Sequence, residues 1–195
     1  MALIDAAFRV GNTMEQCAEL LRALKAVDVR IAPSFAAVVT NTFVKIRQEP
    51  KVPSPQSPYI SSIAYRELVY SRGIWSWAFD LVSCDEVLAA QLVRLTPHVN
   101  YVGKRGSFLQ FLGRLYRRTE LGSSFTQPLA GRDFAVPARS HVRSLDDFGP
   151  DADLETLSSF TSKPAKRAKH RRFVETVIPV GVSNTGPGFT EYRSD

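Results

Sequence analysis

A proline-rich stretch interrupts the first half of the chain and limits how the segments around it can pair. Proline lacks the amide hydrogen that a strand donates to its sheet, so residues 48–58 predict an extended loop, which contains Pro50, Pro53, Pro55 and Pro58. The residues before it, 35–47, are β-branched and aromatic. They predict a strand with one apolar face and one basic face, the latter carrying Phe43, Lys45 and Arg47.

Two helices are predicted from capping signals that precede apolar stripes. The first covers residues 14–27 and begins with a capping box at Thr13. The second begins with a similar box at Ser83 and ends before Pro97. Both stripes are typical of helices that pack one face into a core.

Four further strands complete the predicted pattern. Residues 3–10 alternate between apolar and polar, residues 62–70 and 74–82 predict a hairpin around Ser71-Arg72-Gly73, and residues 108–112 predict a strand after a tight turn. Apart from the inserted strand, the order is β-α-β-β-α-β. This order predicts an α+β fold, a ferredoxin-like (RRM-like) split βαβ domain with an inserted strand.

The chain is expected to have three parts. Residues 1–112 form the ferredoxin-like RNA-binding domain, including the proline-rich loop. Residues 113–172 are polar, charged and weakly periodic, and predict a basic arm or long loop with partial order. Residues 173–195 predict a late strand, a turn and a tail, so the arm and this extension follow the domain.

Cysteine usage and hydropathy exclude several classes of protein. Cys17 and Cys84 are far apart and form no CxxC motif, which excludes a disulfide framework and a cysteine-rich zinc site. No run reaches the roughly 18 apolar residues of a membrane span. The first residues lack the pattern of a signal peptide. We therefore expect a cytoplasmic protein with reduced thiols, no membrane partner and no cofactor.

The positive charge gathers in two stretches of a chain whose net charge is +6. Residues 101–118 and 163–172 are both rich in lysine and arginine and contain no acid, while residues 146–155 between them are acidic. Clustered cations attract phosphates, so the pattern favours a nucleic-acid partner. The alternative is that each basic stretch is only solvated surface.

The sharpest local motif is Gly103-Lys104-Arg105-Gly106-Ser107. Glycines at both ends allow the backbone to turn and approach a ligand, and two cations with a hydroxyl suit phosphate oxygens. It is not a P-loop, because His98 stands where the first glycine is required. A plain basic turn is the equal alternative. The other candidate RNA contacts are Lys45, Arg47, Arg66, Lys166, Arg167, Lys169, Arg171 and Arg172.

Aromatic and titratable residues indicate a function less strongly than the basic stretches do. Phe43 or Tyr65 can stack on a base, although each more often belongs to a core. The histidines show no metal-ligand spacing, and no G-x-S-x-G motif indicates a nucleophile. General acid-base chemistry by His98 with Tyr101 and Lys104 is the weaker alternative, so we assign no catalytic residue.

Residues 60–112 resemble the Cas-five family of CRISPR-associated proteins, which belong to the repeat-associated RNA-binding superfamily. The resemblance is carried by Tyr65-Arg66-Glu67 before a predicted hairpin, and by Val102-Gly103-Lys104-Arg105-Gly106-Ser107-Phe108 after a helix. The chain departs from the family pattern at its N-terminus, where a short strand and a helix precede the proline-rich loop.

The resemblance implies a non-catalytic subunit of a Cascade-type effector complex. Such subunits hold the 5′ handle of the crRNA, extend an arm to the backbone subunit, lie beside the large subunit and act on target DNA only indirectly. One branch also cuts precursor RNA, so a metal-independent endoribonuclease of the same fold is one alternative. A basic nucleic-acid-binding scaffold protein outside CRISPR is the other.

Overall fold

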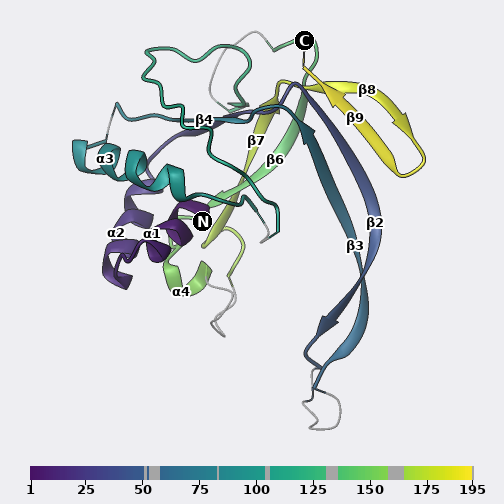
Figure 1. The fold of residues 1–195 in the computed structure, drawn as a ribbon, viewed down its shortest axis with the longest axis horizontal. Helices are drawn as coiled ribbons and strands as arrows, with labels where there is room; N and C mark the ends of the chain where they lie inside the picture. The colour runs from purple at the N-terminus through teal and green to yellow at the C-terminus, as the bar shows by residue number, and fades with distance from the viewer. Residues whose placement is uncertain are drawn as a thin grey trace.

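The chain folds as a mixed α+β protein in which every paired strand is antiparallel to its neighbour, within the part of the chain that is described. The computed structural model describes residues 1–50, 52, 58–82, 84–103, 106–130, 136–157 and 165–194. Three sheets have the orders β1-β4, β3-β2-β9-β8 and β5-β7-β6. Figure 1 shows helices α1 to α3 gathered in one layer, with the long β2–β3 ribbon extending away from them.

The N-terminal segment is a helix, α1 (Ala2–Arg9), and the prediction of a strand over residues 3–10 was wrong. Its alternation is also compatible with a helical period, because the buried side chains are those of Leu3, Ile4, Ala6 and Ala7. Arg9 Nε donates to Asp5 Oδ2 at 2.9 Å, one turn apart, which supports the helix.

The two predicted helices are confirmed. Helix α2 (Met14–Leu24) has the complete capping box, with Thr13 Oγ1 accepting from the Gln16 N–H and Gln16 Oε1 accepting from the Thr13 N–H. Helix α3 (Glu86–Leu95) continues into a short 3-10 turn (Thr96–His98). Its N-cap is Asp85, whose carboxylate accepts from the Leu88 N–H at 2.7 Å, while Ser83 lies outside the described residues.

The hydrophobic core lies between these three helices. It is built from α1, α2 and α3 and is closed by Trp77 and Phe79 from one side and by Leu154 and Leu157 from another. Its largest fully buried members are Ile4, Leu20, Leu21, Leu95 and Cys17. Trp77 and Phe79 are thus partly buried against the core.

The longest strands are β2 (Ala36–Gln48) and β3 (Ile60–Arg72), which pair over all 13 positions. This confirms a strand before the proline-rich segment, whose residues 51 and 53–57 lie outside the description. The expected hairpin around Ser71-Arg72-Gly73 was wrong. β3 pairs backward with β2, and the next strand, β4 (Ser76–Phe79), pairs with β1 (Val29–Ala32). The proline-rich segment, not the Gly73 turn, joins the paired strands.

Only the base of this ribbon is supported by a third strand. β9 (Phe189–Arg193) pairs with β2 from Ala36 to Thr40, and β8 (Gly181–Gly186) pairs with β9. Residues 41–48 and 60–67 form a two-stranded extension beyond that support, which we call the arm from here on; it is a different segment from residues 113–172, for which the sequence predicted an arm. At about 3.3 Å per residue the arm extends about 26 Å beyond Thr40.

A second region of sheet lies beside the helices. It comprises β5 (Gln127–Pro128), β7 (Arg171–Ile178) and β6 (His141–Phe148), and the short helix α4 (Leu154–Leu157) follows β6. The late strand predicted from residue 173 is thus β7, which ends before Pro179. The residues predicted as a turn and tail include β9, and residues 108–112 contribute only the single bridge Tyr101–Phe108.

The strand order does not confirm the ferredoxin-like split βαβ arrangement. In that arrangement the four strands of a β-α-β-β-α-β unit form one antiparallel sheet. The named strands of the described residues are instead divided among three sheets, and the chain begins with two helices. None of the helices in the described ranges has both the length and the apolar composition to cross a bilayer.

Candidate nucleic-acid interface

One face of the arm carries aromatic side chains that are open to solvent. Because side chains alternate along a strand, the cross-strand partners Phe43 and Tyr65 share a face with Lys45, Arg47 and Ile63. Phe43 is 72% exposed and Tyr65 is 59% exposed. Their centroids are 5.0 Å apart with a tilt of 56°, so the two rings pack on each other and leave their outer surfaces free.

The same face carries cations. Lys45 and Arg47 are exposed and make no ion pair or side-chain hydrogen bond with any described residue. Glu67 is on this face as well, but it lies opposite Asn41 at the base of the arm. The distal half of the face therefore combines two available cations with two exposed rings, the residue types that hold a single-stranded polynucleotide.

Arg66 lies on the other face of the arm. It is opposite Thr42 and is half-buried beside the partly buried Val44 and Ala64. Tyr65 and Glu67 therefore face one way and Arg66 the other. The structure therefore separates Arg66 from Lys45 and Arg47, and one strand of RNA lying on a single face contacts only one of these two sets.

A backbone hydrogen bond joins the residues on the two sides of the motif's glycines. The Val102 N–H donates to the Ser107 carbonyl at 3.2 Å, and Gly103 and Gly106 have φ of +79° and +102°. A Cβ on either glycine would meet open space, so positive φ rather than crowding explains why glycine stands there. Ser107 is exposed. Lys104 and Arg105 lie outside the described residues, and their phosphate contacts stay a prediction.

The C-terminal basic tract is partly occupied by contacts within the chain. Arg171 Nε donates to Asp146 Oδ2 at 2.8 Å, and Arg172 Nε donates to Asp147 Oδ2 at 2.9 Å. The Asp146 carboxylate also raises the pKa of Arg171. Before them, Arg167 lies over the ring of Phe173, with its guanidinium carbon 4.6 Å from the ring centroid.

The turn at residues 165–170 leaves Lys166 and Lys169 exposed. The sequence analysis noted the acidic residues upstream but did not predict that two of them pair with the tract. The pairing depends on the register of β6 against β7, which no local pattern contains.

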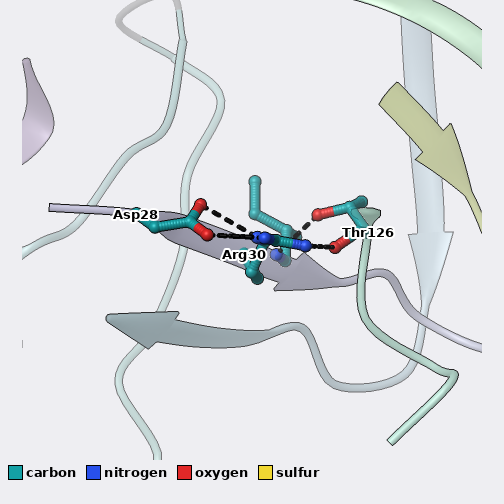
Figure 2. Close-up of polar contacts among 4 residues, drawn as sticks. Asp28, Arg30 and Thr126 are labelled. Carbon is teal, nitrogen blue, oxygen red and sulfur yellow. Dashed lines mark hydrogen bonds and ion pairs between the residues drawn. The ribbon is translucent and has the colours of Figure 1, made fainter. Parts of the chain in front are cut away.

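A buried charged cluster joins β1 to Thr126, the residue directly before β5 (Figure 2). The sequence analysis did not predict it. Arg30 Nε lies 2.9 Å from both carboxylate oxygens of Asp28, and Arg30 Nη1 donates to the Thr126 carbonyl at 3.1 Å. Thr126 in turn accepts from the Ile31 N–H through Oγ1 and donates its own N–H to the Ile31 carbonyl. Since its groups satisfy one another, the cluster is structural.

Two of the histidines are held by hydrogen bonds with backbone groups. His141 Nδ1 donates to the Val180 carbonyl at 2.7 Å, and His170 Nδ1 accepts from the Lys166 N–H. Burial raises the pKa of the Cys17 thiol, which keeps it protonated and unreactive. Within the described ranges no group of histidine, cysteine and acidic residues is placed to hold a metal ion.

The arm face and the basic tract both present exposed cations. Comparison with family models, curated proteins and solved structures found no match to this chain. The interpretation of the site therefore depends on its own geometry.

Proposed function

We propose that this chain is a non-catalytic, RNA-binding subunit of a CRISPR Cascade-type effector complex in the cytoplasm, where it binds and caps the crRNA 5′ handle. The observation that carries the proposal is the distal face of the arm. Exposed Phe43 and Tyr65 stand beside Lys45 and Arg47, which have no partner among the described residues. Stacking and phosphate contacts together are how proteins hold unpaired RNA.

Two further features support the proposal. A Cβ on Gly103 or Gly106 would meet open space, and both glycines belong to the motif that carries the Cas-five resemblance. The arm is a thin ribbon with apolar side chains on both faces, and such a ribbon is marginal by itself in water. A subunit that inserts it between RNA and a neighbouring backbone subunit explains why these side chains are exposed. The large subunit is the expected second partner, and target DNA is contacted indirectly.

Two double variants that each remove two positive charges, K45A/R47A in the arm and R22A/R143A outside it, test the role of the arm. K45A/R47A is expected to weaken binding of labelled poly-uridylate about 10-fold and to flatten the salt dependence of log K by about 1.4, since two phosphate contacts are lost. F43A is expected to weaken binding about 10-fold with little change in that slope, because stacking is less sensitive to salt than a phosphate contact.

R22A/R143A is the control, because it removes two exposed cations outside the arm. It is expected to change the affinity by less than about twofold. Equal effects of the two double variants would mean that binding depends only on the net charge of the chain, and would contradict the assignment of the arm as the RNA site. The glycine turn is tested in the same way by K104A/R105A, which should weaken retention of RNA without changing the unfolding temperature.

The CRISPR role needs a separate measurement. RNA that co-purifies with the chain from its native host is expected to share one repeat-derived 5′ sequence and to bring a backbone subunit with it. A mixture of RNAs without a common 5′ end would contradict the handle-binding role and leave only a general nucleic-acid binder.

A further inference from the structure

The ion pairs of the basic tract lie on opposite faces of the β6–β7 ribbon. Asp147 is directly opposite Arg172, whereas Asp146 is directly opposite Phe173. Neighbouring residues of a strand point to opposite faces, so the pair Arg172–Asp147 occupies one face. The pair Arg171–Asp146 occupies the other, together with Phe173.

The face with Phe173 has the composition of a polynucleotide site. Phe173 is 43% exposed and Arg167 lies over its ring, while Arg171 stands two residues before it on the same strand. A ring and two guanidinium groups on one surface offer stacking and phosphate contacts together. One feature opposes this use: the Asp146 carboxylate holds Arg171 by Nε and by Nη2.

The Asp146–Arg171 contact is open to solvent and therefore easily exchanged. The Arg171 side chain is 49% exposed and the Asp146 side chain 39%. Exposed ion pairs contribute little net stability, because both groups are well hydrated when they separate. A phosphate offers the guanidinium the same bidentate geometry as a carboxylate, so one anion can replace the other without moving the backbone.

We propose that Asp146 is a built-in competitor for phosphate: it masks Arg171 in the free chain, and a phosphate group of the bound polynucleotide displaces it on the face that carries Arg167 and Phe173. The proposal rests on the proposed RNA-binding function. Asp147 has no such role, because its pair with Arg172 lies on the opposite face. The mask lowers binding to weakly held, nonspecific RNA and leaves Arg171 available to an RNA already fixed elsewhere on the subunit.

The geometry supplies a matched pair of variants for the test. D146N and D147N each remove one carboxylate charge from adjacent positions of β6, and each breaks one arginine pair of the same kind. With labelled poly-uridylate and the full chain, D146N is expected to raise the affinity about fivefold, the effect of freeing one exposed ion pair. It should also steepen the salt dependence by about 0.7, one phosphate on a single strand.

D147N is expected to change the affinity by less than about twofold. R171A added to D146N should abolish the gain, whereas R172A added to D146N should keep it. Thermal unfolding of both aspartate variants checks that they are folded, and D146S replaces D146N if the amide is not tolerated.

The possible results separate the two proposals. Equal gains from D146N and D147N, or no gain from D146N in a chain that binds RNA, would overturn the mask and leave the RNA-binding function intact. If neither the parent chain nor D146N binds poly-uridylate, both the mask and the proposed function are wrong.

Discussion

Replacing Arg30 with methionine tests the buried cluster that fastens β1 to the chain before β5. The Arg30 side chain is 11% exposed, and its guanidinium serves both the Asp28 carboxylate and the Thr126 carbonyl. Methionine fills a similar volume but donates no hydrogen bond. The substitution therefore removes two interactions at once and leaves their acceptors in place.

The expected cost follows from the burial of those acceptors. The Thr126 residue is 6% exposed, so its carbonyl loses a charged donor without access to water, which costs about 2 kcal/mol. The Asp28 side chain is 37% exposed and recovers part of its hydration, so its loss is discounted to about 1 kcal/mol. The sum of about 3 kcal/mol lowers the unfolding temperature by about 9 °C in a chain of this length.

The measurement is urea unfolding followed by circular dichroism, together with a double-mutant cycle. D28L alone should cost more than R30M, because it leaves a buried guanidinium without its counter-ion. The double variant D28L/R30M should cost clearly less than the two single variants added together. A cycle in which the costs simply add, or an R30M midpoint equal to that of the parent chain, would refute the claim that the cluster joins these segments.

Three further substitutions test local features of the fold. Gly149→Ala would place a Cβ 2.2 Å from the Lys169 carbonyl oxygen, so it should destabilise the chain by about 3 kcal/mol in urea unfolding; a loss of less than about 0.5 kcal/mol would show that the two backbones separate easily. Ala168 has a φ of +69°, so Ala168→Gly should stabilise the chain by about 0.5 kcal/mol, and destabilisation in the same assay would contradict the strain assigned to it. Hydrogen bonds from Thr156 lower the pKa of Asp153, so its contribution to stability is complete above the ordinary value of 3.8 and is lost as the pH falls through the lower folded value. Carboxyl NMR titration of T156V should show a pKa of Asp153 raised only part of the way to its ordinary value, because the backbone N–H of residue 156 still donates to the carboxylate, and an unchanged pKa would mean that the Thr156 hydroxyl does not contribute.

Sequence reasoning succeeded where the signal is local. The capping box at Thr13 identifies the start of α2 because its two hydrogen bonds close within one turn. The alternation along β3 correctly places Tyr65 and Arg66 on opposite faces because a strand has a period of two. The exposed basic and aromatic face of β2 follows from the same rule.

Sequence reasoning failed where a segment pairs with residues that are far from it in the sequence. The turn residues around Gly73 predicted a local hairpin, but β3 pairs over 13 positions with the strand on the other side of the proline-rich segment. The arginines of the tract were read as free cations because the register that brings Asp146 and Asp147 to them is set by the sheet. Residues 3–10 were misjudged because eight residues fit a strand or a helix almost equally.

The support of the arm by β9 affects how the protein is made. β2 meets β3 through the residues directly between them, so this ribbon can close soon after both leave the ribosome. Its third strand lies at the other end of the sequence, and long-range pairings of this kind form late. In a nascent chain the β2–β3 ribbon is therefore not yet fixed to a third strand. The arm acquires a fixed direction only when β9 emerges and pairs with Ala36 to Thr40.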